Sequence, residues 1–280
     1  MIQSLFAGVS GMLANQTEMD IIGNNIANAN TTGFKEATAN FTESYLQVSR
    51  AATGNQPVGL EVGLGTSVNS TETDFSQGVF QTTNVPTDLG INGNGFFTVQ
   101  DINGDNYVTR NGAFVQDSNG FLRTTDGNYL MGSMGATAPT SPTAGFAPDK
   151  IQIPADAASG SPVVSFTVDA SGAITVTGED GSTNVVGYVT VQSYSNPNGL
   201  SNVGNSLYQY ETAAGTNQFY AAGSSALVGT IQSGVLEASN VNLSTEFANM
   251  IVTQSGFSAA ARVITVSDSM LQTVTNLKQN

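Results

Sequence analysis

The stretch from 239 to 278, SNVNLSTEFANMIVTQSGFSAAARVITVSDSMLQTVTNLK, decides the fold class because it has the pattern of one long helix. Apolar residues recur at seven-residue intervals in two adjacent rows: Met250, Phe257, Ile264 and Leu271, and Val263, Met270 and Leu277. Such rows are typical of a coiled-coil seam. Gly256 is the one helix-weakening residue in the stretch. We expect an N-cap at Ser239, Asn240 or Ser244, with Glu246 favourably placed in the first turn.

The first thirty residues contain a second helical pattern. Steps of three and four residues separate Ile2, Leu5, Val9, Met12, Gln16, Met19, Gly23 and Ile26. This spacing predicts a helix with a narrow apolar stripe. Asn and Gly then cluster between 24 and 33, which predicts the end of the helix.

The middle of the chain, about 60–236, has the pattern of β-structure. Short apolar runs occupy 95–99, 107–109, 113–115, 165–168, 174–176 and 185–191. Turn pairs follow several of them: Asn103-Gly104, Asn111-Gly112, Asn119-Gly120 and Ser171-Gly172. Such pairs between β-runs favour hairpins. The stretch 101–105 faintly resembles a calcium loop, but position 112 is Gly rather than the late Glu ligand, so we expect a hairpin turn.

These patterns predict an α+β protein in which terminal helices pair as a coiled coil around an inserted, mainly β domain. We expect a helical domain from 1–30 plus 239–280, an extended hinge connector at 31–70, and a β-rich domain at 71–238. A loop or small excursion is expected at 133–162, which is rich in Ala, Pro, Ser, Thr and Gly. The apolar stripes either form a private intramolecular core or, being broad on the second helix, bind further helices by self-association.

Composition excludes several classes of function. The 280 residues include no Cys and no His, so disulfides, thiolate zinc sites and His-based catalysis are absent. The acidic pairs Glu18/Asp20 and Glu72/Asp74 have no accompanying nucleophile or base, and we expect neither an enzyme, a metal site nor a cofactor. The net charge is −14 without a basic patch, which argues against nucleic acid and anionic membrane as partners.

The N-terminus lacks the pattern of a secretory signal. The first basic residue is Lys35, so the positive n-region of a Sec signal peptide is missing. No apolar run is long enough for membrane insertion. The protein is therefore expected either to stay in the cytoplasm or to leave by a route that reads no cleavable signal peptide.

Six further stretches carry a resemblance to a known family. They are IGNNIANANTTGFK at 22–35, GNGFF at 93–97, YVTRNGAF at 107–114, NPNGL at 196–200, GNSLY at 204–208 and GVLEASNVN at 234–242. In sequence and order they resemble the motifs of bacterial flagellar rod and hook proteins, with Val108 as a one-residue insertion. Residues 255–256, Ser-Gly, depart from the Arg-Ala or Arg-Asn often found there. The stretch IGNN at 22–25 and the ending MLQTVTNLK at 270–278 look slightly more like hook protein than rod protein. The length is close to that of a distal rod protein and would also fit a compact hook subunit.

The resemblance implies a structural subunit that self-assembles into the tubular hook, the flexible joint that transmits motor torque to the filament. The alternative is a distal or proximal rod subunit, the drive shaft of the basal body. A secreted adhesin-like β protein is a third, weaker hypothesis. The implied partners are copies of the chain itself, other axial proteins (rod, hook–filament junction and hook cap), and the flagellar type III export apparatus. The implied location is the extracellular hook or basal body, without a cleaved signal peptide.

The resemblance also gives roles to residues. We expect the terminal helices to mediate self-assembly through Ile2, Leu5, Val9, Met12, Met19, Ile26, Met250, Phe257, Val263, Ile264, Met270, Leu271, Val274 and Leu277. The Asn-rich signature is read as a helix terminator and, compatibly, as a hinge formed by Asn24, Asn25, Asn28, Gly33 and Phe34.

Overall fold

The computed structural model describes residues 2–44, 46–50, 60–135, 148–156, 160–225 and 227–278. The chain divides into two compact units. Unit 1 consists of Met1–Ala29, Glu36–Asp74 and Val241–Asn280, and unit 2 of Asn30–Lys35 and Phe75–Asn240. Both chain ends therefore belong to one unit, and the β-rich middle forms the other. The α+β class with terminal helices and an inserted β domain is confirmed.

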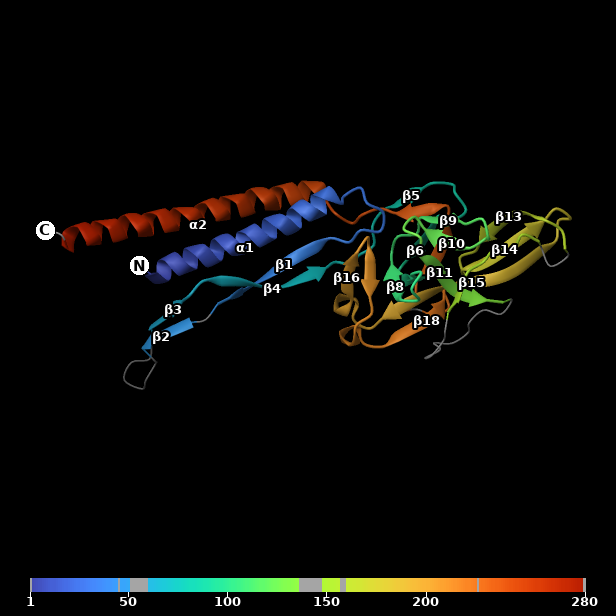
Figure 1. Cartoon of the computed structure of the whole chain (residues 1–280), viewed down its shortest axis with the longest axis horizontal. Coiled ribbons are helices and arrows are strands. Elements are labelled where there is room, and N and C mark those ends of the chain that lie inside the picture. Colours follow the sequence, from blue (N-terminus) through green and yellow to red (C-terminus); the bar gives the residue numbers. More distant parts are fainter. Residues whose placement is uncertain are drawn as a thin grey trace. The chain divides into compact units, whose positions relative to one another are not determined.

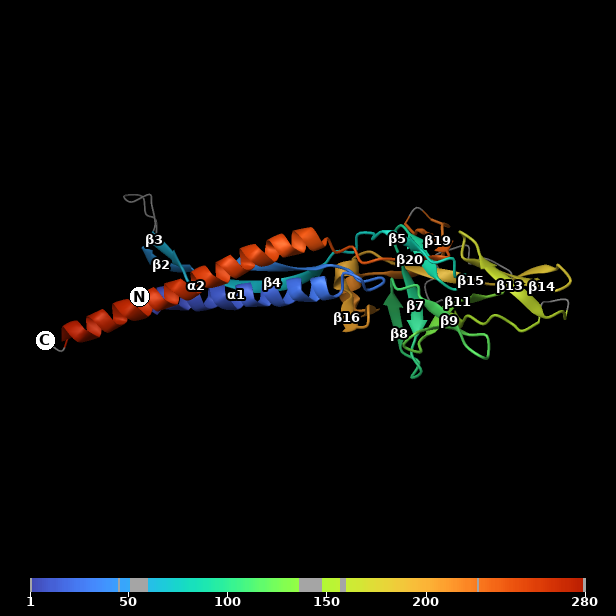
Figure 2. The ribbon, with the colours of Figure 1, turned by 90° about the horizontal axis from the view of Figure 1, so that it is seen from above.

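Unit 1 contains two long helices and a β-ribbon (Figure 1). Its elements are α1 (Ile2–Ala27), β1 (Ala37–Glu43), β2 (Leu46–Arg50), β3 (Leu60–Gly63), β4 (Thr66–Thr73) and α2 (Leu243–Lys278). Helix α1 packs against α2 on one side and against β1 and β4 on the other, and Figure 2 shows the same neighbours from above. Neither helix is long and apolar enough to cross a membrane.

The ribbon occupies residues expected to form an extended connector. Strand β1 pairs antiparallel with β4, and β2 pairs antiparallel with β3. Most side chains of β4 are polar and exposed, so the apolar alternation that announces a strand is weak there. The paired strands at 37–43, 46–50, 60–63 and 66–73 differ from the extended connector expected at 31–70.

Helix α2 begins at a cap that the sequence analysis did not choose. The side-chain oxygen of Asn242 accepts the backbone N–H of Ser244 at 3.0 Å, and its carbonyl accepts the N–H of Glu246 at 3.0 Å. Asn242 is thus the N-cap, and the expectation of Ser239, Asn240 or Ser244 is wrong. Ser244 lies inside the first turn instead.

The described residues of unit 2 form sixteen strands and two short 3₁₀ turns. The strands are β5 (Phe80–Thr82), β6 (Leu89–Asn92), β7 (Phe96–Gln100), β8 (Asn106–Thr109), β9 (Phe114–Gln116), β10 (Leu122–Thr124), β11 (Tyr129–Met134), β12 (Asp149–Lys150), β13 (Val163–Val168), β14 (Ala173–Gly178), β15 (Thr183–Tyr194), β16 (Ser201–Gly204), β17 (Leu207–Gln209), β18 (Asn217–Ala221), β19 (Thr230–Ser233) and β20 (Val235–Glu237). The main sheet runs β13-β14-β15-β11-β7-β8-β17-β16, and β6–β19 and β5–β20 form separate pairs.

Three of the four predicted hairpin turns join paired strands. The turn at Gly104 joins β7 to β8, that at Gly120 joins β9 to β10, and that at Gly172 joins β13 to β14. The stretch 101–105 is accordingly a hairpin turn.

Asn111-Gly112 makes no hairpin. Strand β8 pairs with β7 and β17, whereas β9 pairs with β10. The N–H of Leu89 donates to the carbonyl of Gly112 at 3.0 Å, and a Cβ on Gly112 would lie 1.6 Å from the Leu89 carbonyl oxygen. Glycine is needed here for close backbone approach rather than for a turn.

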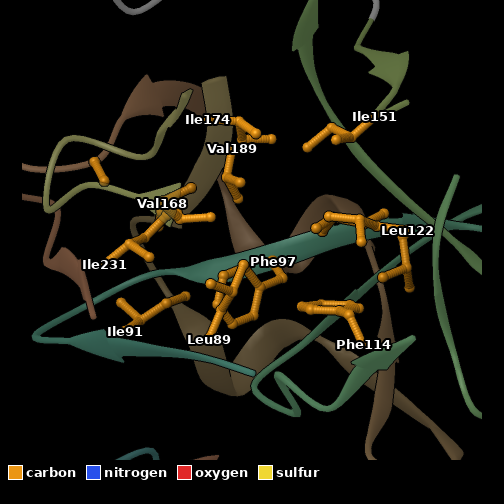
Figure 3. Close-up of a cluster of buried hydrophobic side chains, with 14 of the residues drawn as sticks. Leu89, Ile91, Phe97, Phe114, Leu122, Ile151, Val168, Ile174, Val189 and Ile231 are labelled. Carbon is orange, nitrogen blue, oxygen red and sulfur yellow. The ribbon is translucent and has the colours of Figure 1, made fainter. Parts of the chain in front are cut away.

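The core of unit 2 collects apolar side chains from strands far apart in the sequence (Figure 3). Fully buried members include Leu89, Phe97, Phe114 and Val189, and the Phe97 and Phe114 rings meet edge to face at 5.4 Å. Residues 136–147 and 157–159 of the predicted excursion at 133–162 lie outside the described residues. Its described parts include the end of β11 and all of β12.

Candidate assembly interface

Small and polar side chains form the contact between α1 and α2. The Ser4 and Ser267 hydroxyls lie 3.2 Å apart. A Cβ on Gly8 would lie 3.1 Å from Cγ1 of Ile264, and a Cβ on Gly256 would lie 2.7 Å from the amide oxygen of Asn15. As the residue numbers of the contacts rise along α1, those of their partners fall along α2, so the two helices are antiparallel. Glycines at the seam let two backbones approach more closely than a leucine seam would allow.

The predicted stripe of α1 lies beside this seam rather than in it. Ser4, Gly8 and Gly11 face α2. Three predicted residues, Leu5, Val9 and Met12, each follow one of them by one position. One residue turns a helix by about 100°. The predicted stripe therefore lies beside these contact residues on the helix surface, and its role in self-assembly stays a prediction. The half-buried residues of the predicted row are Leu5, Val9, Met12, Met19 and Ile26; the side chain of Ile2 lies outside the described ones.

The first predicted row of α2 is partly covered within unit 1. Met250, Phe257, Ile264 and Leu271 are all half-buried. Ile264 faces Gly8, and the neighbouring Ala260 faces Gly11. Small residues on α1 therefore receive the branched side chain of α2.

The second predicted row of α2 is exposed. Five side chains of α2 are 43% to 73% exposed, and we call them the exposed row: Val263, Val266, Met270, Val274 and Leu277. On α1, Phe6 is 61% and Leu13 is 59% exposed, seven positions apart. Covering one such half-exposed side chain stabilises by about 1 kcal/mol. These rows are apolar surface of unit 1 that favours association with another helix.

The Asn-rich signature ends α1 and fastens it to β1. The amide of Asn25 donates to the Ala37 carbonyl at 2.8 Å, and its oxygen accepts the Ala37 N–H at 3.1 Å. Asn28 donates from its side chain and its backbone to the Asn24 carbonyl. Asn25 is buried, whereas Asn24 is exposed. The terminator role expected of the signature fits these bonds, and its role as a hinge stays a prediction.

Gly33 and Phe34 belong to unit 2. The backbone N–H of Gly33 donates to the Glu237 carbonyl at 2.8 Å, and its φ of +68° lies in the left-handed region. A Cβ on Gly33 would meet the Asn111 nitrogen at 2.5 Å. Phe34 is half-buried. Glycine is thus required at 33 both for its conformation and for space.

A buried group of three charges joins three sequence motifs inside unit 2. The Lys35 ammonium lies 2.7 Å from Oε1 of Glu237, and Nη1 of Arg110 lies 3.3 Å from Oε2. All three side chains are at most 3% exposed. We call them the ion triad. Burial lowers the pKa of Arg110, an effect that the charge and hydrogen bond of Glu237 oppose.

Backbone carbonyls add further hydrogen bonds to the ion triad. Lys35 also donates to the Ser76 carbonyl at 2.6 Å, and Arg110 donates to the carbonyls of Ile91 and Gly93 at 3.3 and 2.8 Å. The first chain segment of unit 2 contributes Lys35 and the second contributes Arg110 and Glu237, so the triad fastens the first segment to the second. Sequence reasoning assigned these residues no role. The signal was that two of only seven basic residues lie inside motifs.

Comparisons with known proteins follow the same motifs. Three family descriptions match: Flagella basal body rod protein at 5–35, Flagellar hook protein FlgE/F/G D1 domain at 90–176, and Flagellar basal body rod FlgEFG protein C-terminal at 232–277. The flagellar basal-body rod protein FlgG of Bacillus subtilis is 35% identical over 287 residues, which cover 100% of both chains. This chain belongs to the FlgE/F/G family of flagellar rod and hook proteins. Members of this family are structural components of the flagellum.

Within the family, rod proteins match over more of the chain than hook proteins do. FlgG of Borreliella burgdorferi is 34% identical over 100% of both chains. The hook protein FlgE of Helicobacter mustelae is 46% identical over 141 residues, which cover 48% of this chain and 31% of that protein. The rod alternative is therefore better supported than the expected short hook protein. A solved Helicobacter pylori FlgE2 structure aligns at 11% identity, with a TM-score of 0.24, over 72% of this chain and 56% of that one.

Proposed function

We propose that this chain is a subunit of the flagellar rod, the drive shaft of the basal body, and polymerises through its terminal helices. The observation that carries the rod assignment is full-length similarity to FlgG rod proteins. The exposed row of α2, together with Phe6 and Leu13, supports polymerisation because these apolar side chains stay 43% to 73% exposed in a single unit 1. Neighbouring copies would provide that cover.

The proposed assembly follows the physical chemistry of the helices. The chain would travel unfolded through the flagellar type III export apparatus, and unit 2 would fold after exit. The ordering of α1 and α2 costs conformational entropy, which burial against neighbouring copies offsets. Other axial proteins at the two ends of the polymer would be the remaining partners.

A pair of variants tests polymerisation. Val263→Asp/Met270→Asp places two charges on the exposed row. Thr265→Asp/Asn276→Asp places two charges at exposed polar positions of the same helix. Purified wild-type protein and the control should form tubes under the electron microscope, and the first variant should remain unassembled. Equal assembly of both variants would remove the exposed row from the interface.

Tube shape separates the rod from the hook. The second candidate, a hook subunit, is favoured by the 46% identity to hook protein over part of the chain. Straight tubes of wild-type protein are the result expected for a rod. Curved tubes would return the assignment to the hook.

A further inference from the structure

Four segments of unit 1 meet where the helices reach the ribbon. Asn25, in the last turns of α1, is bonded to Ala37 at the start of β1 and donates to Oε1 of Glu246 on α2 at 3.3 Å. The N–H of Asp74, just after β4, donates to the Glu36 carbonyl at 2.8 Å. This junction brings three carboxyl groups together: Glu36, Asp74 and Glu246.

Glu246 is buried with one oxygen unmatched. Its residue is 2% exposed, and Oε2 has no hydrogen-bond donor among the described residues. It lies in the first turn of α2, where the helix dipole favours a negative charge. Within the described part of the chain, Oε2 of Glu246 therefore lacks the donor that a buried carboxyl oxygen ordinarily has.

Glu36 is the member best placed to hold a proton. Its carboxyl group is hydrogen-bonded to that of Glu246, a bond that two ionised carboxylates cannot make. Burial, that bond, and the charges of Glu246 and Asp74 together raise the pKa of Glu36 above its ordinary value. A hydrogen bond from the Asn242 backbone acts in the opposite direction. A proton on Glu36 supplies a donor to the buried carboxyl group of Glu246.

No nearby cation replaces this proton. The side chain of α1 that contacts Glu246 is the neutral amide of Asn25. Lys35, which precedes Glu36, is paired with Glu237 in unit 2. Among the described side chains of unit 1, the basic residue is Arg262, roughly four turns further along α2. No group of three acidic side chains in the described ranges is arranged to hold a metal ion.

We propose that Glu36 and Glu246 form a proton-sharing latch that joins the ends of α1, β1 and α2, so that ordering of the terminal helices, and assembly with it, is favoured at acid pH. The link to assembly rests on the proposed function. The latch itself rests on the buried, unmatched carboxylate and the carboxyl group held beside it.

The sign and size of the effect follow from proton linkage. The ordered junction binds its proton more tightly than the unordered chain, in which the pKa of Glu36 is near 4.5. The stabilisation is complete below that value and is lost as pH rises through the raised pKa of Glu36. One proton per subunit changes the critical concentration for assembly by at most about tenfold per pH unit within this window.

The critical concentration of the full chain, measured by sedimentation from acid to neutral pH, tests the latch. Wild-type protein should need more subunit as pH rises. Glu36→Gln replaces the proton by a permanent amide donor and should lose about one proton of that dependence. Glu246→Gln, which places the donor on the other partner, should do the same if Glu36→Gln fails to fold. Asp20→Asn, an exposed site on α1, should keep the wild-type dependence.

The outcomes separate the two proposals. Equal pH dependence in wild type and both Gln variants would overturn the latch while leaving the assembly proposal intact. If the chain forms no tubes at any pH, the assembly proposal fails. The latch is then decided on the monomer by the pH dependence of its thermal loss of helical circular dichroism, with the same difference between wild type and Glu36→Gln expected.

Discussion

Replacement of Glu237 by Gln should destabilise unit 2 more than the loss of either cation. Glu237 accepts from Lys35 at 2.7 Å, from the Gly78 N–H at 2.9 Å and from Arg110 at 3.3 Å. Gln at this position leaves two buried positive charges without a carboxylate. Removal of one partner of a buried ion pair costs about 3–5 kcal/mol, and here two pairs lose the same partner.

Lys35→Met should reduce the stability of unit 2 by less than Glu237→Gln does. The Arg110–Glu237 pair stays in place, and Oε1 of Glu237 keeps the Gly78 N–H. The losses are the bond to Glu237 and the bond to the Ser76 carbonyl, together about 1–3 kcal/mol. The geometry of the ion triad therefore predicts which variant loses more stability, whatever the absolute values of the two losses.

Urea unfolding of the full chain, followed by tyrosine fluorescence, measures both losses. The signal reports on unit 2 because seven of the eight tyrosines, all except Tyr45, lie in it. Glu211→Gln, at an exposed position, is the matched control and should be neutral. If Lys35→Met costs as much as Glu237→Gln, the carboxylate is not the centre of the ion triad and the reasoning is refuted.

Three further predictions concern the helix seam, the α2 cap and the unit 2 core. Gly8→Leu should raise the critical concentration for assembly about thirtyfold, near 2 kcal/mol, because a Cβ at this position already meets Ile264 and the Ala260 carbonyl. The control Gly23→Leu places its side chain in open space and should leave the critical concentration unchanged. Asn242→Ala should cost about 1 kcal/mol of α2 stability, measured by the critical concentration for assembly, whereas Asn242→Asp should keep the capping bond to Ser244. An equal loss in both variants would show that the side chain of Asn242 does not stabilise the helix as an N-cap. Burial raises the pKa of Tyr208 from 10.0 to about 12, so the stability that its neutral form contributes is complete below pH 10 and lost toward pH 12. Alkaline unfolding of unit 2 should be less steep in Tyr208→Phe, and an unchanged slope would remove Tyr208 as its cause.

Local sequence patterns predicted the helices and hairpin turns, but they did not predict which residues form the contact between α1 and α2. The seven-residue rows of α2 and the Gly104 and Gly120 turns depend on neighbours in sequence, and the structure has them at those positions. The seam between α1 and α2 uses Gly8, Gly11 and serines, which carry no hydropathy signal. An apolar period therefore indicates a helix but not which of its faces meets the partner.

The ion triad and the carboxyl junction were beyond sequence reasoning for a related reason. Lys35 and Glu237 are 202 positions apart, and Asn25 and Glu246 are 221 positions apart. Charged and amide residues of this kind read as solvated surface unless the fold buries them. The motifs at 22–35 and 234–242 contain Asn25, Lys35 and Glu237, whereas Glu246 lies just beyond the second. Their roles appear only when the fold brings distant parts of the sequence together.

Helical reconstruction by electron cryo-microscopy of tubes grown from the purified full chain tests the central claim most directly. The account predicts a straight tube in which Val263, Val266 and Met270 on α2 lie against a helix of a neighbouring copy. A tube held together by unit 2 alone, with the same three side chains facing water, would contradict it.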